Sequence, residues 1–125
     1  MKFNVLMLIK AAVCLVLGSL ILVVPDFVYS IFGTTLGPGG VFAAREYGAS
    51  LFGNLMVAWF ARNAVESVAR RALILGLCVY DALGFVVTLI AQLNGTLNAL
   101  GWLVVALYLF FAVGFGYFYF RSPKP

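Results

Sequence analysis

Four long apolar runs, separated by short polar segments, make up most of the chain. They cover about residues 3–24, 41–61, 72–93 and 97–120. A helix that crosses a bilayer needs about 20 largely apolar residues, and each run has about that length. The breaks are a Gly-Pro-Gly-Gly turn, the charged segment 62–71 and an Asn-Gly turn. The pattern predicts four transmembrane helices with short loops.

The apolar runs are continuous, whereas strands of a membrane barrel alternate between apolar and polar positions. Helices and closed barrels are the structures that satisfy every backbone polar group in lipid. Because the runs carry apolar residues on every face, we predict an all-α fold. The expected architecture is a four-transmembrane-helix bundle, formed by a single integral-membrane domain over residues 1–125.

Composition and charge fit a membrane protein. Hydrophobic residues make up 65% of the chain and charged residues 10%, against about 25% charged in soluble domains. The basic residues that flank the runs are Lys2, Arg62, Arg70, Arg71, Arg121 and Lys124. The positive-inside rule therefore places both termini and the 62–71 loop in the cytoplasm. We expect a multi-pass protein of the bacterial inner membrane, with the net charge of +4 reflecting topology and no nucleic-acid partner.

The sequence lacks the residues that common catalytic and metal sites require. It has no histidine, which argues against bis-His haem, His-based metal sites and Ser-His or Cys-His nucleophiles. Cys14 and Cys78 fall in different runs, without a Cys-x-x-Cys pair. We therefore predict no catalytic residue, no metal and no cofactor.

Two stripes of polar side chains lie within the runs. Helical spacing puts Asp81, Gly84, Thr88 and Gln92 on one face of the third run, and Glu46, Ser50 and Asn54 on one face of the second. The two runs should be antiparallel, so equal depth pairs Asn54 with Asp81, Ser50 with Gly84, and Glu46 with Thr88. These positions predict a hydrogen-bonded seam between the second and third helices.

Asp81 would lie about 15 Å from the cytoplasmic end of its helix, near the middle of the bilayer. Lys10 reaches a similar depth along the first run, so the two side chains can form an ion pair. Such a pair can hold helices together, as polar groups do in membrane bundles. It can also mark a transport pathway or polarise a ligand. We favour the structural role and keep the others as alternatives.

Small residues recur four positions apart, a spacing that lets helix backbones approach closely. The pairs are Cys14 with Gly18, Ala44 with Gly48, Ala49 with Gly53, and Ala72 with Gly76. Their number supports a compact bundle, with contact to another copy or another protein as a further use.

Several stretches resemble a family of uncharacterised four-span bacterial inner-membrane proteins, classed as a domain of unknown function. They are "VVPDFVYSIFG", "AAREYGASLFGNLMVAWFAR", "ARRALILGLCVYDALGFVVTLIAQLNGTLNALGW" and "LYLFFAVGFGYF". The resemblance covers most of the chain and implies a four-helix bundle in the inner membrane. It transfers no active residue.

Three classes of function remain. The expected one is a non-catalytic accessory subunit that stabilises a larger membrane complex, with lipid and other membrane subunits or further copies as partners. The alternative is a small proton-coupled transporter or a lipophilic-ligand-binding protein that acts as an oligomer. A membrane transferase is the third class, since Arg62, Asn63 and Glu66 superficially resemble the polar cluster of four-span glutathione transferases.

Overall fold

The computed structural model describes residues 1–122 and consists of five helices joined by short segments. They are α1 (Phe3–Val23), α2 (Pro25–Ile31), α3 (Pro38–Phe60), α4 (Val68–Leu93) and α5 (Gly101–Arg121). Lys124, one of the basic residues that predict the topology, lies outside the described residues. The all-α prediction is confirmed for the described part of the chain.

Three helices, α1, α4 and α5, are long and apolar enough to cross a membrane. The chain is therefore a candidate membrane protein by the length and composition of its helices. α3 has 23 residues but is not among the three, because polar side chains such as Arg45, Glu46 and Asn54 interrupt its apolar sequence. The predicted four-helix bundle is accordingly not confirmed as such.

The segment between the first two apolar runs, which the apolar pattern predicts to be a connection, contains the helix α2. Pro25 occupies the start of α2, where its fixed φ and missing N–H suit the first helical turn. Asp26 lies in that same turn, and a carboxylate is favourable beside the free N–H groups of a helix start. Pro25 and Asp26, which end the first apolar run, therefore also begin a new helix.

Three predicted boundaries also differ from the structure. α3 begins at Pro38 instead of residue 41, and α4 begins at Val68 instead of residue 72. Ser67 caps α4 by accepting a hydrogen bond from the Arg70 N–H at 3.1 Å, which explains the earlier start. The fourth run was expected from residue 97, but α5 begins at Gly101, because Asn98 instead anchors a loop.

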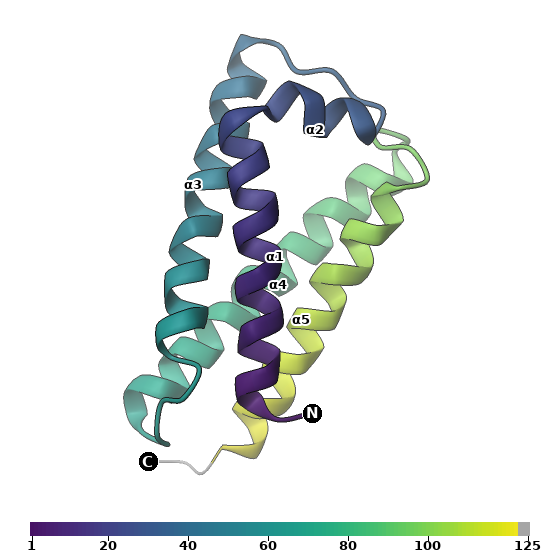
Figure 1. Cartoon of the computed structure of the whole chain (residues 1–125). Helices are drawn as coiled ribbons and strands as arrows, with labels where there is room; N and C mark the ends of the chain where they lie inside the picture. The colour runs from purple at the N-terminus through teal and green to yellow at the C-terminus, as the bar shows by residue number, and fades with distance from the viewer. Residues whose placement is uncertain (123–125) are drawn as a thin grey trace.

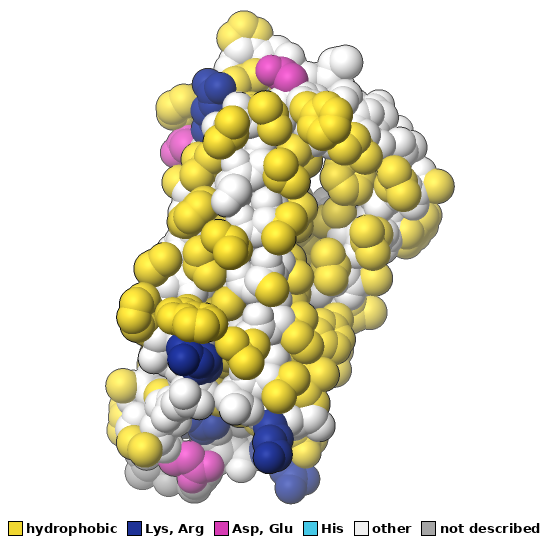
Figure 2. Space-filling model, viewed as in Figure 1, with side chains coloured by type: hydrophobic (Ala, Val, Ile, Leu, Met, Phe, Trp, Pro, Cys, Tyr) yellow, Lys and Arg dark blue, Asp and Glu magenta, His cyan; other side chains and the backbone are white. Residues whose placement is uncertain are grey.

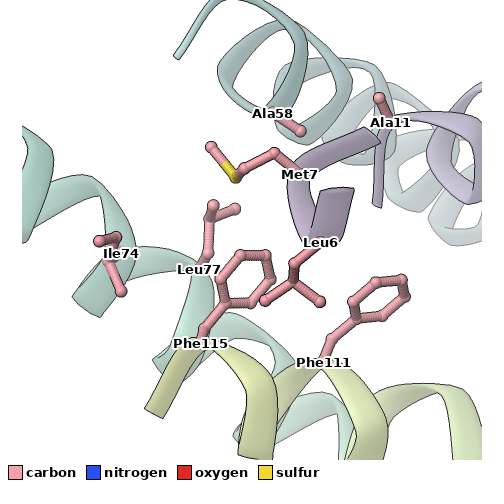
Figure 3. Packing of buried hydrophobic residues seen from close by; sticks show 8 residues of the cluster. All are labelled: Leu6, Met7, Ala11, Ala58, Ile74, Leu77, Phe111 and Phe115. Carbon is pink, nitrogen blue, oxygen red and sulfur yellow. The ribbon is translucent and has the colours of Figure 1, made fainter. Parts of the chain in front are cut away.

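The helices form two hairpins, α1 with α3 and α4 with α5, and α2 lies across the end of the molecule opposite the termini (Figure 1). Near the other end, one apolar cluster joins all four long helices, as Figure 3 shows. Its buried members are Leu6, Met7, Ala11, Ala58, Ile74, Leu77, Phe111 and Phe115. The hairpins are therefore packed together at the end that carries the termini.

Candidate functional site

A cavity of about 480 Å³ lies between the two hairpins, on the α2 side of the apolar cluster. In Figure 2 the surface is hollowed below α2, between α1 and the α4–α5 hairpin. All five helices contribute to its lining, including Ile21 from α1, Val28 from α2, Val104 from α5 and the tyrosines described below. Of the described residues that line the cavity, none is charged. The cavity is thus an apolar space with a small number of polar groups.

Close packing within each hairpin fixes the walls of the cavity. At Gly48 of α3, a Cβ atom would lie 3.2 Å from the carbonyl oxygen of Gly18 in α1, so the two backbones approach closely. At Gly84 of α4, a Cβ atom would overlap the ring of Tyr108 from α5. Glycine therefore lets α3 lie against α1 and lets the Tyr108 ring occupy the space beside Gly84 of α4.

Asn98 ties α2 to the loop before α5. Its backbone N–H donates to the carbonyl of Phe32 at 2.8 Å, and its side-chain N–H donates to the carbonyl of Ile31 at 2.9 Å. Both carbonyls lie at the end of α2, where a helix leaves acceptors without intrahelical partners. Asn98 thereby holds α2 over the cavity and connects it to the second hairpin.

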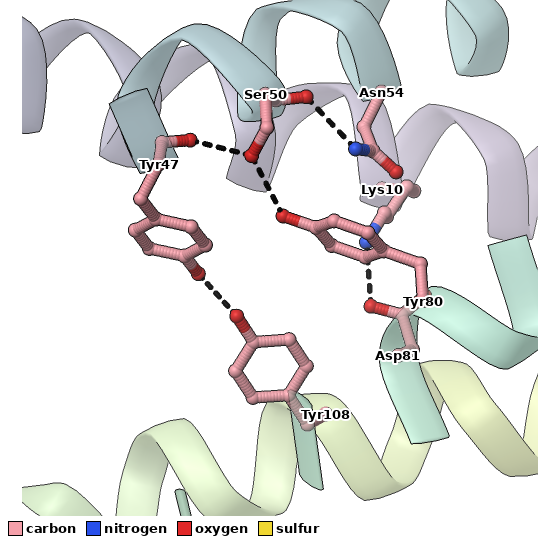
Figure 4. A network of polar contacts seen from close by, with 7 residues as sticks. All are labelled: Lys10, Tyr47, Ser50, Asn54, Tyr80, Asp81 and Tyr108. Atoms are coloured by element: carbon pink, nitrogen blue, oxygen red, sulfur yellow. Dashed lines mark hydrogen bonds and ion pairs between the residues drawn. The ribbon is translucent and has the colours of Figure 1, made fainter. Parts of the chain in front are cut away.

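Hydroxyl groups cross the cavity in two pairs, which Figure 4 shows. The hydroxyls of Tyr47 (α3) and Tyr108 (α5) are hydrogen bonded to each other. The hydroxyl of Ser50 (α3) lies 3.1 Å from that of Tyr80 (α4). Each pair joins one hairpin to the other. The polar groups of the cavity therefore come from all the long helices except α1.

An ion pair lies next to Tyr80, away from the cavity lining. Lys10 Nζ donates to Asp81 Oδ1 at 2.7 Å, with side chains 3% and 0% exposed. The ammonium also lies 5.1 Å from the centre of the Tyr80 ring and 4.9 Å from that of Phe111, where ring faces attract cations. Asp81 Oδ2 is buried without a hydrogen-bond partner among the described residues. The pair that depth alone suggested is present, and it links α1 to α4.

The predicted seam between the second and third runs is largely wrong. Asn54 does not reach Asp81, since its amide donates to the Ser50 carbonyl of its own helix at 2.8 Å. Glu46 is exposed. Thr88 lines the cavity and forms no hydrogen bond with Glu46. The reason is that α3 packs mainly on α1, and α4 mainly on α5. Ser50 is the seam residue that does cross, to Tyr80.

Sequence reasoning missed the tyrosines of the cavity, which are Tyr29, Tyr47, Tyr80 and Tyr108. For three of them, their position in the sequence already indicates a polar site. Tyrosine favours the ends of membrane helices, where its hydroxyl meets water, but Tyr47, Tyr80 and Tyr108 lie within the helices. A tyrosine inside an apolar run needs a hydrogen-bond partner in the protein, which indicates a polar site.

The residues behind the transferase alternative are not gathered into a site. The Arg62 guanidinium stacks on the ring of Trp59 at 3.9 Å and donates to the Trp59 carbonyl at 2.6 Å. Asn63 and Glu66 are exposed. This loop therefore resembles a solvated connection whose arginine is held by its own helix.

No protein-family model, curated protein or solved structure matches the chain. The geometry therefore carries the functional argument alone. The arrangement offers a largely apolar volume, hydroxyl groups that can orient a bound molecule, and a nearby ion pair whose charges are directed at each other.

Proposed function

We propose that this chain is a small membrane protein that binds a neutral lipophilic molecule. The supporting observation is the cavity of about 480 Å³ between the hairpins, with apolar walls and a few tyrosine hydroxyls. Sites for small molecules typically enclose roughly 300–1,000 Å³ and combine apolar walls with few oriented polar groups. A charged ligand is disfavoured, because the lining offers no charge to compensate it.

The ligand enters from the bilayer in this proposal. Leu83 and Val87 of α4 line the cavity and yet are 61% and 67% exposed. They form part of a rim that faces the surroundings of the helices. A lipophile dissolved in the membrane can pass this rim without crossing the polar ends of the protein.

A neutral fluorescent lipophile, 1-aminoanthracene, tests the proposal in detergent-purified protein. Val104→Trp places a large ring in the cavity and should abolish the saturable fluorescence increase. Val113→Trp makes the same substitution on the same helix at a position 63% exposed and should bind like wild type. Equal titration curves for the two variants would reject the cavity as the binding site.

We further propose that α3 lies in the membrane beside α1, α4 and α5, as a four-helix bundle with both termini in the cytoplasm of a bacterium. Basic side chains support this orientation: Figure 2 shows most of the visible Lys and Arg atoms at the end that carries the termini. Arg70 and Arg71 stack on Phe3 and Tyr119 there, each at 4.2 Å. Alkaline phosphatase fused after residue 36 or 95 should be active in cells, and after residue 64 or 122 inactive.

An accessory role in a larger membrane complex is the second candidate, and ligand binding does not exclude it. In support of this role, a groove between α1 and α5 is lined by Leu6, Leu109, Phe110, Val113 and other apolar residues, against which a neighbouring apolar helix could pack. Migration of the solubilised protein with a larger complex on a native gel would support this role. A proton-coupled transporter is less well supported, because Lys10 already pairs with Asp81.

A further inference from the structure

The hydroxyl protons of the cavity can be assigned from its hydrogen bonds. The Ser50 hydroxyl donates to the Tyr47 carbonyl at 2.7 Å. A serine hydroxyl has a single proton, so in the contact at 3.1 Å between Ser50 and Tyr80 the Tyr80 hydroxyl must donate. Both protons of this pair are therefore committed within the protein.

The other pair leaves one proton free. Tyr47 and Tyr108 share one hydrogen bond between their hydroxyls, which uses one of their two protons. The remaining O–H belongs to whichever tyrosine accepts that bond. Because both residues line the cavity, this free O–H is available to a molecule inside it.

Tyr29 adds a second free donor from α2. Tyr29 lines the cavity, and its hydroxyl makes no hydrogen bond to another side chain among residues 1–122. A tyrosine keeps its phenolic proton at neutral pH, and burial raises the pKa of Tyr29 further in that direction. Phenols are good donors and poor acceptors, since the ring draws on the oxygen lone pairs. Donors of this kind bond best to a carbonyl oxygen.

The rings of the tyrosines indicate the shape and charge of the ligand. Tyr47, Tyr80 and Tyr108 present aromatic rings around the same space in Figure 4. Their electron-rich faces favour flat, electron-poor rings in offset stacking, and would also attract a cation. The Lys10 ammonium already lies 5.1 Å from the Tyr80 ring centre with Asp81 as its counter-charge. A cationic ligand would have no such partner, because none of the described lining residues is charged.

We infer that the ligand is a neutral, flat carbonyl compound of the quinone type with an apolar tail, an inference that rests on the proposed function. One carbonyl oxygen accepts from the Tyr47–Tyr108 pair, and the ring lies among the tyrosine rings. The tail leaves over Leu83 and Val87 toward lipid. Binding alone is assigned to this site, with no transfer of electrons.

Tritiated 2-decyl-1,4-benzoquinone, bound to protein in neutral-lipid nanodiscs and corrected for empty discs, tests this inference. Tyr47→Phe or Tyr108→Phe alone leaves one hydroxyl with its proton free, so each should change Kd by less than about twofold. The double variant removes the donor and should raise Kd about fivefold, the effect of one hydrogen bond. Tyr117→Phe, at an exposed position of α5, is the matched control, and thermal unfolding verifies that all variants fold.

Competitors separate this inference from the proposed function. Decylbenzene lacks the carbonyls and should compete at least about fivefold less well than the quinone with wild type, a difference that should narrow in the double variant. Equal competition by decylbenzene, or an unchanged Kd in the double variant, would overturn the carbonyl assignment while 1-aminoanthracene binding stands. Stronger competition by tetraphenylphosphonium would replace it with a cation site. Quinone retention no higher than in empty discs would also overturn the carbonyl assignment. If wild type failed to bind 1-aminoanthracene too, the proposed binding of a lipophile would be rejected.

Discussion

At the scale of single residues, Lys10 and Asp81 form a buried ion pair between the hairpins. Its Nζ and Oδ1 atoms are 2.7 Å apart, and both side chains are buried. Removing two charges from water costs several kcal/mol each, which their attraction offsets only when the geometry is good. The pair therefore specifies how the hairpins meet more than it adds net stability.

Replacing one partner of this ion pair should lower the free energy of unfolding much more than replacing both partners. Lys10→Met leaves the Asp81 carboxylate buried and uncompensated, and should lower the free energy of unfolding by about 3 kcal/mol. The double variant Lys10→Met/Asp81→Leu should recover most of that loss. Unfolding in mixed detergent and SDS micelles measures both. A double variant as unstable as Lys10→Met would contradict this view of the pair.

The sequence predicts depth well at this scale and direction around a helix poorly. A fixed rise per residue placed Lys10 level with Asp81, and the structure joins them. The same rule matched Ser50 to Gly84, whereas its partner is Tyr80, one turn away. Depth depends on counting alone, but the facing side chain depends on how the helices are rotated and packed.

At the scale of elements, some glycines allow two helix backbones to pack closely and others do not. The sequence offered four pairs of small residues with equal weight. In the structure, Gly18 and Gly48 bring α1 and α3 together, while Gly53 and Gly76 have open space where a Cβ would lie. Spacing identifies surfaces that permit close packing, but it does not say which of them meets another helix.

Gly48→Leu should therefore disrupt the α1–α3 hairpin. A Cβ at this position would lie 3.0 Å from a Leu22 side-chain atom and 3.2 Å from backbone atoms of α1. Overpacking of this kind costs about 1–3 kcal/mol, which SDS unfolding would detect. Gly76→Leu is the control and should unfold like wild type, because Gly76 is exposed and a Cβ there would have no other atom within 4 Å. Equal losses in both variants would contradict the proposed packing.

The whole molecule is two hairpins that meet at one end and enclose a cavity at the other, with α2 tied across it. The helical content and most of the long helices followed from apolar runs. The pairing of the helices into hairpins did not follow from these runs. A short loop makes two successive helices antiparallel, but it does not show whether they pack against each other, and α3 and α4 pack mainly on other helices. The cavity was unpredictable for the same reason, since it exists where α3 and α4 fail to pack along their length.

Loosening α2 should speed exchange of the bound molecule. Asn98→Ala removes the side-chain bond to Ile31 and the acceptor that caps the Leu100 N–H, at 2.9 and 3.0 Å. At about 1 kcal/mol for each bond, 1-aminoanthracene should dissociate several-fold faster in stopped-flow displacement. Asn94→Ala, exposed in the same loop, should leave the rate unchanged. An unchanged rate in Asn98→Ala would show that α2 does not gate the cavity.

Native mass spectrometry of protein purified without added ligand would show whether a lipophile is held between the hairpins. Wild type and Val113→Trp should carry a discrete neutral adduct, with one molecule per chain. Val104→Trp, whose new ring occupies the cavity, should carry none. An adduct of the same mass and occupancy on Val104→Trp, or bare protein in all three samples, would contradict a lipophile held between the hairpins.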